Sequence, residues 1–215
     1  GEMLGERGMW FKKHFFEPSL RVPLLMKLPG VAPARVSTLS SLVDLLPTFM
    51  GIAEGTGWSS DIEPLEGMDL TALINHEQPD RAVYAEYLAE ATTAPIFMIR
   101  RGQHKFISSA DDPALLFDLN SDPQERNNLA NDPSQAHLVA SFQAEVEQKW
   151  NHDALTEKIR LSQRQRRLIL RGYDQGAKPR WNHDEEADSD VIWYRGEGGY
   201  NEWAFSYLPV TRDDS

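Results

Sequence analysis

Two adjacent lysines, Lys12 and Lys13, stand within the aromatic stretch WFKKHFF near the start of the chain, just after a glycine-rich loop. A lysine held against apolar rings presents a compact positive charge, which suits it to bind an oxygen atom of an anionic substrate. Because most lysines are simply solvated, this pair indicates an anion site only together with other features of the sequence.

Carboxylates and aromatic rings recur at two later places and suit a different ligand. Glu86 and Glu90 lie in AEYLAE, and the last forty residues hold Tyr200, Glu202 and Trp203 within GYNEWAFSY. A quaternary ammonium group cannot donate hydrogen bonds, so aromatic faces and carboxylates are the groups that recognise it. Tyrosine and tryptophan are also enriched where subunits meet, so burial in an oligomer interface is the alternative for each tail aromatic.

Two further charged clusters have ordinary explanations. The arginines between Arg164 and Arg167 could bind phosphate or nucleic acid, and the run from His183 to Glu186 could bind a metal ion. The net charge of −11 favours a salt-bridge face for the first cluster. An acidic run such as the second cluster more commonly forms a solvated loop than a metal site.

Composition limits the class of protein and its partners. The 215 residues are 40% hydrophobic and 26% charged, which is typical of a globular chain. With 22 basic and 33 acidic residues, the charge argues against nucleic acid or an anionic membrane as the main partner. The absence of cysteine excludes a cysteine nucleophile within this chain and fits a cytoplasmic location. The start, GEMLGERGMW, has neither an initiator Met nor a basic apolar leader, so we expect it to lie inside a longer protein.

The first eighty residues are rich in glycine and proline, and few regular elements are predicted in them. Residues 10–16 are predicted to form a short aromatic element. Residues 21–27 are predicted to form a buried strand, which Pro23 confines to a sheet edge. The apolar spacing after residue 36 predicts a helix that starts near Asp44 as its N-cap, because Pro47 is tolerated only in a first turn. A short helical turn is expected over 70–75.

Residues 81–173 have the pattern of a small α+β unit. Four apolar runs bounded by turn residues predict antiparallel strands at 82–88, 95–102, 104–109 and 114–119. Helical apolar spacing predicts one helix over 134–150 and a second over 152–172, which Gly172 would end. Such a unit does not look like a complete enzyme by itself.

Five segments of the chain resemble one known family. GEMLGERGMWFKKHFFEPSLRVPLL is similar to the segment that follows the metal-binding Ser-Asp-His-Gly loop of type I sulfatases in the alkaline phosphatase superfamily, with Gly1 as the last residue of that loop. The segments SSLVDLLPTFMGIA, AEYLAE, IRRGQHKFI and LFDLNSDPQERNNLA follow in the same order. The stretch KWNHDALTEKIRLSQRQRRLIL and the aromatic tail resemble the choline-sulfatases within that family.

The resemblance implies a fold class and its boundaries. The chain would be the C-terminal portion of the α/β sulfatase fold, which is alkaline phosphatase-like. Residues 1–80 would end the large α/β domain, and residues 81–173 would form a small antiparallel sheet packed with a helix. Residues 174–215 would form an extended tail that contacts another subunit of a homo-oligomer.

The resemblance also implies roles for individual residues. Lys12 would contact the sulfate group and neutralise charge on a sulfuryl oxygen, whereas Lys13 would be structural. Glu17 and Arg21 would brace the loop by pairing with each other. Glu86 and Glu90 would approach the rim of the active site. The tail residues Tyr200, Glu202 and Trp203 would help to close the site of a neighbouring subunit.

The implied activity is hydrolysis of a sulfate ester, with choline sulfate giving choline and sulfate. The nucleophile would be a formylglycine made from the Cys (or Ser) of a Cys-x-Pro-x-Arg motif, and a divalent cation, Ca²⁺ by family habit, would hold the sulfate oxygens. No such motif occurs here, so both groups are expected upstream and this chain alone is expected to be inactive. A phosphonate or phosphate monoester hydrolase of the same superfamily and a non-catalytic oligomerisation module remain the alternatives.

Overall fold

The computed structural model describes residues 1–55, 58, 64–74 and 80–176. The chain divides into two units, Gly1–Ser162 and Gln163–Ser215, and the boundary between them falls inside the last helix. The boundaries predicted at residues 80 and 173 stay predictions. In the part of the chain that the structure describes, no helix is long and apolar enough to span a membrane.

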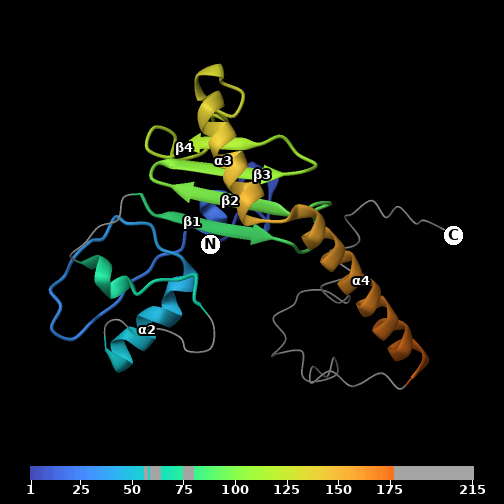
Figure 1. Cartoon of the computed structure of the whole chain (residues 1–215), viewed down its shortest axis with the longest axis horizontal. Coiled ribbons are helices and arrows are strands. Elements are labelled where there is room, and N and C mark those ends of the chain that lie inside the picture. The colour runs from blue at the N-terminus through green and yellow to red at the C-terminus, as the bar shows by residue number, and fades with distance from the viewer. Residues whose placement is uncertain (56–57, 59–63, 75–79, 177–215) are drawn as a thin grey trace. The chain divides into compact units, whose positions relative to one another are not determined.

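A four-stranded antiparallel sheet forms the centre of the first unit (Figure 1). Its strands follow the order of the sequence and are β1 (Ala82–Tyr87), β2 (Ile96–Arg101), β3 (His104–Ser109) and β4 (Leu115–Asp118). The four predicted strands are therefore confirmed, with small differences at their ends. Arg101 pairs with His104 across the β2–β3 turn, and Gly102 in that turn has a φ of 50°, which favours glycine.

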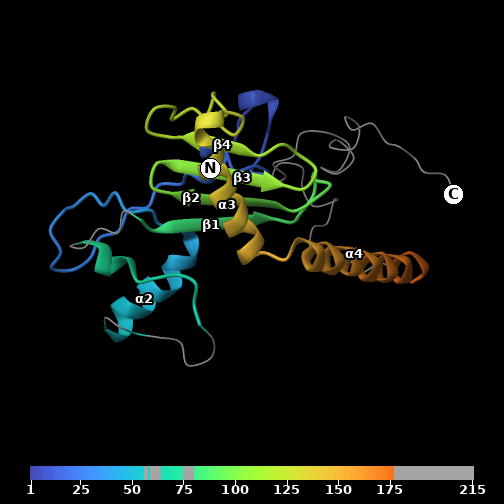
Figure 2. The same ribbon diagram turned by 45° about the horizontal axis from the view of Figure 1, so that its top comes forward.

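Helix α3 (Ala136–Lys149) lies across one face of this sheet, as Figure 2 also shows. The chain enters it through a short 3-10 helix, Pro133–Gln135, where the Asp132 side chain accepts a hydrogen bond from the Ser134 backbone. Phe142 and Val146 are buried against the sheet, and the Phe142 ring stacks on Phe106 with 5.5 Å between centroids. The predicted helix over 134–150 is confirmed.

Helix α4 (His152–Gln175) follows α3 almost directly. Leu155, in its first turn, packs against the cluster beneath α3. The predicted helix over 152–172 is confirmed, but it continues past Gly172, which does not stop it. Leu168 and Ile169 are exposed, and so is the arginine cluster that starts at Arg164.

The N-terminal segment packs on the opposite face of the sheet. It contains a 3-10 turn, Glu6–Gly8, and a single helical turn, α1 (Glu17–Leu20), that was not predicted. Phe15 is buried there in a cluster with side chains from three strands, Met98, Ile107 and Phe117. The two faces of one small sheet thus hold α3 and the N-terminal segment.

Residues 36–74 confirm one predicted helix and correct its start. The helical path begins as a 3-10 turn at Leu42–Asp44 and continues as α2 (Leu45–Glu54), and the predicted turn near residue 70 is the 3-10 helix Leu70–Ile74. Asp44 stands directly before α2, as predicted, but its backbone is already helical and its side chain makes no capping hydrogen bond to α2. Its buried carboxylate instead accepts hydrogen bonds from the backbone N–H groups of Ser41 at 2.7 Å and Met68 at 3.0 Å, and it pairs with Arg81 at 2.5 Å.

The strand predicted over 21–27 is wrong. These residues have no regular structure and their apolar side chains are exposed, with Leu25 at 89%. A strand needs a neighbour that receives its backbone hydrogen bonds, and this segment pairs with no strand among the described residues. Pro23 also removes one donor.

Candidate active site

The N-terminal segment closes into a compact loop that carries Lys12 at its end. The backbone N–H of Met3 donates to the Phe11 carbonyl at 3.1 Å, and that of Gly5 donates to Met9 at 2.9 Å. The Met3 side chain is buried beneath the loop. Gly1 approaches the Ser19 backbone so closely that a Cβ there would lie 2.0 Å from the Ser19 carbonyl oxygen, so only glycine fits.

Three non-glycine residues of this loop have left-handed backbone conformations. The φ angles are 50° at Leu4, 55° at Arg7 and 69° at Phe11. Such conformations cost energy in L-residues and persist only where the surroundings enforce them, which is common at functional sites. Phe11 directly precedes Lys12, so the strained backbone sets the direction in which the chain presents that lysine.

Lys12 is exposed, whereas its neighbour has partners within the chain. The Lys13 ammonium pairs with Glu90 at 3.5 Å and lies 5.5 Å from the centre of the Phe11 ring. Next to it, burial lowers the pKa of His14, and the charge of Lys13 lowers it further. The structure thus brings Lys13 and Glu90 together and leaves Lys12 facing outward.

The predicted pair of Glu17 with Arg21 is wrong, because Glu17 binds a buried lysine instead. The Lys105 ammonium contacts Glu17 at 2.5 Å and Glu125 at 2.8 Å, and it donates to the Phe15 carbonyl at 2.9 Å. Sequence reasoning missed this cluster. One signal could have pointed to it, because Glu125 belongs to the LFDLNSDPQERNNLA segment.

The other carboxylate of AEYLAE lies on the opposite face of the sheet. Glu86 accepts a hydrogen bond from the indole nitrogen of Trp150 at 2.7 Å. That indole packs in the cluster beneath α3, where it stacks on Phe97 with 4.7 Å between centroids. Glu86 on β1 thus binds Trp150, whereas Glu90, which follows β1, binds Lys13, and their roles at a substrate rim stay predictions.

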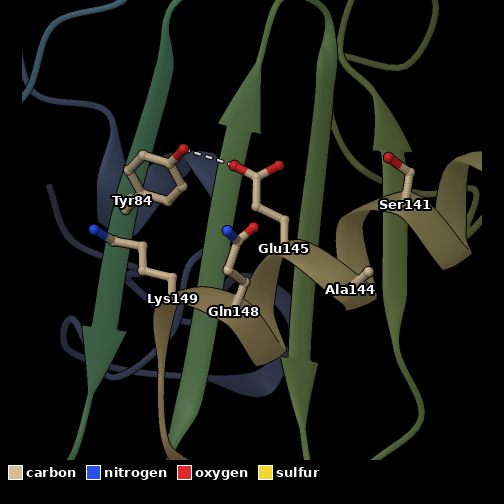
Figure 3. A pocket seen from close by; sticks show the side chains of 6 residues that line it. All are labelled: Tyr84, Ser141, Ala144, Glu145, Gln148 and Lys149. Atoms are coloured by element: carbon tan, nitrogen blue, oxygen red, sulfur yellow. Dashed lines mark hydrogen bonds between the residues drawn. The ribbon is translucent and has the colours of Figure 1, made fainter.

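An open pocket of 510 Å³ lies on the α3 face, between β1 and the exposed side of the helix (Figure 3). Among the side chains that line it, those of Tyr84, Glu145 and Lys149 have partners within the chain. Glu145 pairs with Arg101 at 2.8 Å and accepts from the Tyr84 hydroxyl at 2.6 Å, and the Lys149 ammonium lies over the Tyr84 ring at 4.4 Å. These contacts stabilise the packing of α3 on the sheet.

No metal centre forms in the described part of the chain, where no three carboxylate or histidine side chains gather closely enough to hold an ion. The chain also has no cysteine that could be converted to formylglycine. The predicted ligand-binding residues Tyr200, Glu202 and Trp203, and the acidic run from His183 to Glu186, lie outside the described residues.

Comparison with known proteins identifies the family. Residues 5–152 match the family model described as N-sulphoglucosamine sulphohydrolase, C-terminal. The chain is 40% identical over 189 residues to the choline-sulfatase of Rhizobium meliloti (strain 1021), covering 85% of this chain and 36% of that protein. It therefore spans about a third of the length of this relative.

Two solved structures share the fold. The structure of BT4656 in complex with its substrate D-glucosamine-2-N,6-O-disulfate superposes with a TM-score of 0.55 at 27% identity, over 69% of this chain and 32% of that one. The phosphonate monoester hydrolase SpPMH from Silicibacter pomeroyi gives a TM-score of 0.56 at 23% identity with the same coverage, which shows the fold alone. The predicted fold class, part of the alkaline phosphatase-like sulfatase fold with a small antiparallel sheet, is confirmed, and the chain belongs to the sulfatase family as a C-terminal part of it.

Proposed function

We propose that the intact protein hydrolyses choline sulfate to choline and sulfate, and that this chain supplies Lys12 to the sulfate group. The observation that carries the proposal is the 40% identity to a choline-sulfatase over 85% of the chain. The geometry supports the lysine, because Lys12 is exposed at the end of a closed loop while Lys13 is engaged by Glu90. An ammonium group held in place would stabilise the charge that develops on a sulfuryl oxygen.

In this proposal, the remaining catalytic groups come from sequence outside this chain. Sulfatases use a metal ion and a formylglycine, and the described residues do not fit either group. We place the formylglycine and the ligands of a divalent cation, Ca²⁺ in our proposal, in sequence that precedes Gly1. The chain by itself would then bind no metal and have no activity, and the whole protein would act in the cytoplasm.

The tail supplies the choline-binding groups in this proposal. Tyr200 and Trp203 offer aromatic faces and Glu202 offers a carboxylate, which together can hold a quaternary ammonium group. We propose that the tail does so at the active site of a neighbouring subunit in a homo-oligomer. Aromatic residues suit both tasks, because they are enriched at subunit interfaces.

The test compares three substrates of the full-length protein, produced with its maturation machinery. Product release would be measured from choline sulfate, an aryl sulfate and a phosphonate monoester. We expect choline sulfate to have the highest kcat/KM, and Trp203→Ala to abolish that preference while Trp181→Ala, a matched change earlier in the tail, retains it.

Preference for the phosphonate ester would support the hydrolase alternative instead. Preference for the aryl sulfate, with Trp203→Ala unchanged, would keep the sulfatase activity and contradict the choline assignment. An intact protein that releases product from none of the three substrates would favour the non-catalytic oligomerisation module.

A further inference from the structure

A buried ion cluster joins the N-terminal segment to the sheet. Lys105 on β3 is fully buried, with an exposed fraction of 0%, and Glu125, which follows β4, is 1% exposed. The Lys105 ammonium has three oxygen partners, namely Glu125 at 2.8 Å, Glu17 at 2.5 Å and the Phe15 carbonyl at 2.9 Å. Two of these three oxygens belong to the N-terminal segment.

The Glu125 side chain and backbone complete the attachment. Its second carboxylate oxygen accepts a hydrogen bond from the Glu17 backbone N–H at 2.7 Å. The Arg7 guanidinium donates to the carbonyl oxygens of Gln124, at 2.7 Å, and Glu125, and it lies 4.2 Å from the centre of the Phe16 ring. Residues from both ends of the segment are therefore fixed to one turn after β4.

Stability alone does not account for this arrangement. A buried ion pair gains little net stability over well-packed apolar residues of similar size, because both charges lose their hydration. A buried ammonium with three oxygen partners does, however, allow only one position for the chain that supplies two of them. The cluster therefore determines where Phe15 and Glu17 lie.

Lys12 lies between two fixed points of the segment. On one side, the Phe11 carbonyl accepts a hydrogen bond from Met3, which is buried. On the other side, the Phe15 carbonyl accepts from Lys105 and the Phe15 ring packs on the sheet. Only three residues separate these points, so a shift at Phe15 would move the backbone of Lys12.

We propose that Lys105 is a positioning residue for Lys12: the buried Lys105–Glu17–Glu125 cluster holds the N-terminal segment so that the Lys12 ammonium meets the substrate anion. This inference rests on the proposed function, because Lys105 acts through Lys12 and does not itself contact the substrate. A misplacement of about 1 Å in a catalytic group can cost about 100-fold in rate. Loss of the cluster should therefore act on turnover through Lys12.

The test is a double-mutant cycle in the full-length protein with its maturation machinery, using choline sulfate and the aryl sulfate as substrates. Lys105→Met removes the ammonium and keeps an unbranched side chain of similar length. We expect it to lower kcat/KM about 100-fold in the presence of Lys12 and to change it little in a Lys12→Ala background. A purely structural role would give the same loss in both backgrounds.

Two further variants keep the test decisive. Glu17 is 23% exposed, so Glu17→Gln removes one partner of Lys105 without leaving an isolated buried charge, and it replaces Lys105→Met if that variant does not fold. Glu145→Gln is the matched control, because it breaks the Arg101 pair on the opposite face of the sheet. We expect this control to leave kcat/KM unchanged.

The outcomes separate the two proposals. If Lys12→Ala abolishes activity but the cycle is additive, or if neither cluster variant lowers kcat/KM, the positioning role is overturned while the proposed function stands. If Lys12→Ala leaves the turnover of both substrates unchanged, the role of Lys12 fails and the positioning inference fails with it.

Discussion

At the scale of single residues, the partly exposed carboxylate of Glu145 is held by an ion pair with Arg101 and a hydrogen bond from Tyr84. Burial by itself raises its pKa, but hydrogen bonds from Arg101 and Tyr84 and the charges of Arg101 and Lys149 bring the pKa below its ordinary value. The pKa of Tyr84 is raised, first by burial and then by its hydrogen bond to Glu145. The ionised carboxylate is therefore the form that the folded state prefers.

The pH dependence of stability follows from this lowered pKa. A carboxylate whose folded pKa is depressed contributes stability above its unfolded pKa, about 4.3 for Glu, and loses it as the pH falls through the folded value. We expect Glu145→Gln to lower the Tm of the full-length protein at neutral pH, and the difference from wild type to shrink in acid. Thermal melts from pH 7 to pH 3 would measure this, and a constant difference across the range would contradict it.

Sequence reasoning found the exposed charge at Lys12 but not the buried charge at Lys105. Lysine is almost never fully buried unless it is paired, so a lysine in a strand is expected at the surface. The burial of Lys105 depends on Glu17, 88 residues earlier, and on Glu125, and both meet it only in the tertiary fold. The sequence suggested that Glu17 pairs with nearby Arg21, but in the structure it pairs with the distant Lys105.

At the scale of elements, α3 stabilises the sheet through two buried side chains. Phe142 and Val146 lie one helical turn apart and enter the cluster of Phe97, Ile99, Phe106 and Leu116. The near-parallel stacking of Phe142 on Phe106, with 8° between ring planes, fills the space between helix and strand. Neighbouring residues on the outer side of the helix, such as Ser141, are exposed.

Truncation of the buried ring should therefore be costly. We expect Phe142→Ala to reduce the free energy of unfolding by about 3–5 kcal/mol, because it removes buried apolar contacts and leaves a cavity. The neighbouring control Ser141→Ala should change it by less than about 0.5 kcal/mol. Chemical denaturation would measure both, and equal small effects would show that α3 does not stabilise the sheet.

The elements that sequence predicted well are those whose signals are local. Turn residues bound each of the four strands, and the apolar spacing of α3 and α4 has the helical period. The segment 21–27 has an apolar composition typical of a strand but no partner in the sheet, and Asp44 has an N-cap residue type but binds Arg81 and Met68. Both errors arise because tertiary partners decide what local patterns leave open.

At the scale of the whole molecule, many large apolar side chains that precede the sheet in the sequence are exposed. The chain covers 36% of a curated relative, and the exposed apolar side chains between residues 22 and 52 are Val22, Leu24, Leu25, Met26, Val31, Val36, Leu42, Val43, Leu46, Phe49 and Ile52. Large exposed apolar patches mark interaction surfaces. We expect the rest of the sulfatase to cover the exposed apolar side chains between residues 22 and 52.

Exposure of this surface has a measurable consequence. Residues 1–215 produced alone should bind a hydrophobic dye such as ANS and associate in solution, whereas the full-length protein should bind far less dye per molecule. Replacing Leu25, Leu46 and Phe49 with serine should reduce dye binding by the isolated chain. Equal dye binding by the isolated and full-length proteins would show that this surface stays open in the intact enzyme.

The measurement that tests the central claim most directly compares two neighbouring lysines in the full-length protein. We predict that Lys12→Ala lowers kcat/KM for choline sulfate by about 100-fold or more, the usual effect of removing one group that stabilises transition-state charge. Lys13→Ala should change it little, because the Lys13 ammonium is engaged by Glu90. Full activity in Lys12→Ala, or equal losses in both variants, would contradict the assignment of Lys12 to the sulfate group.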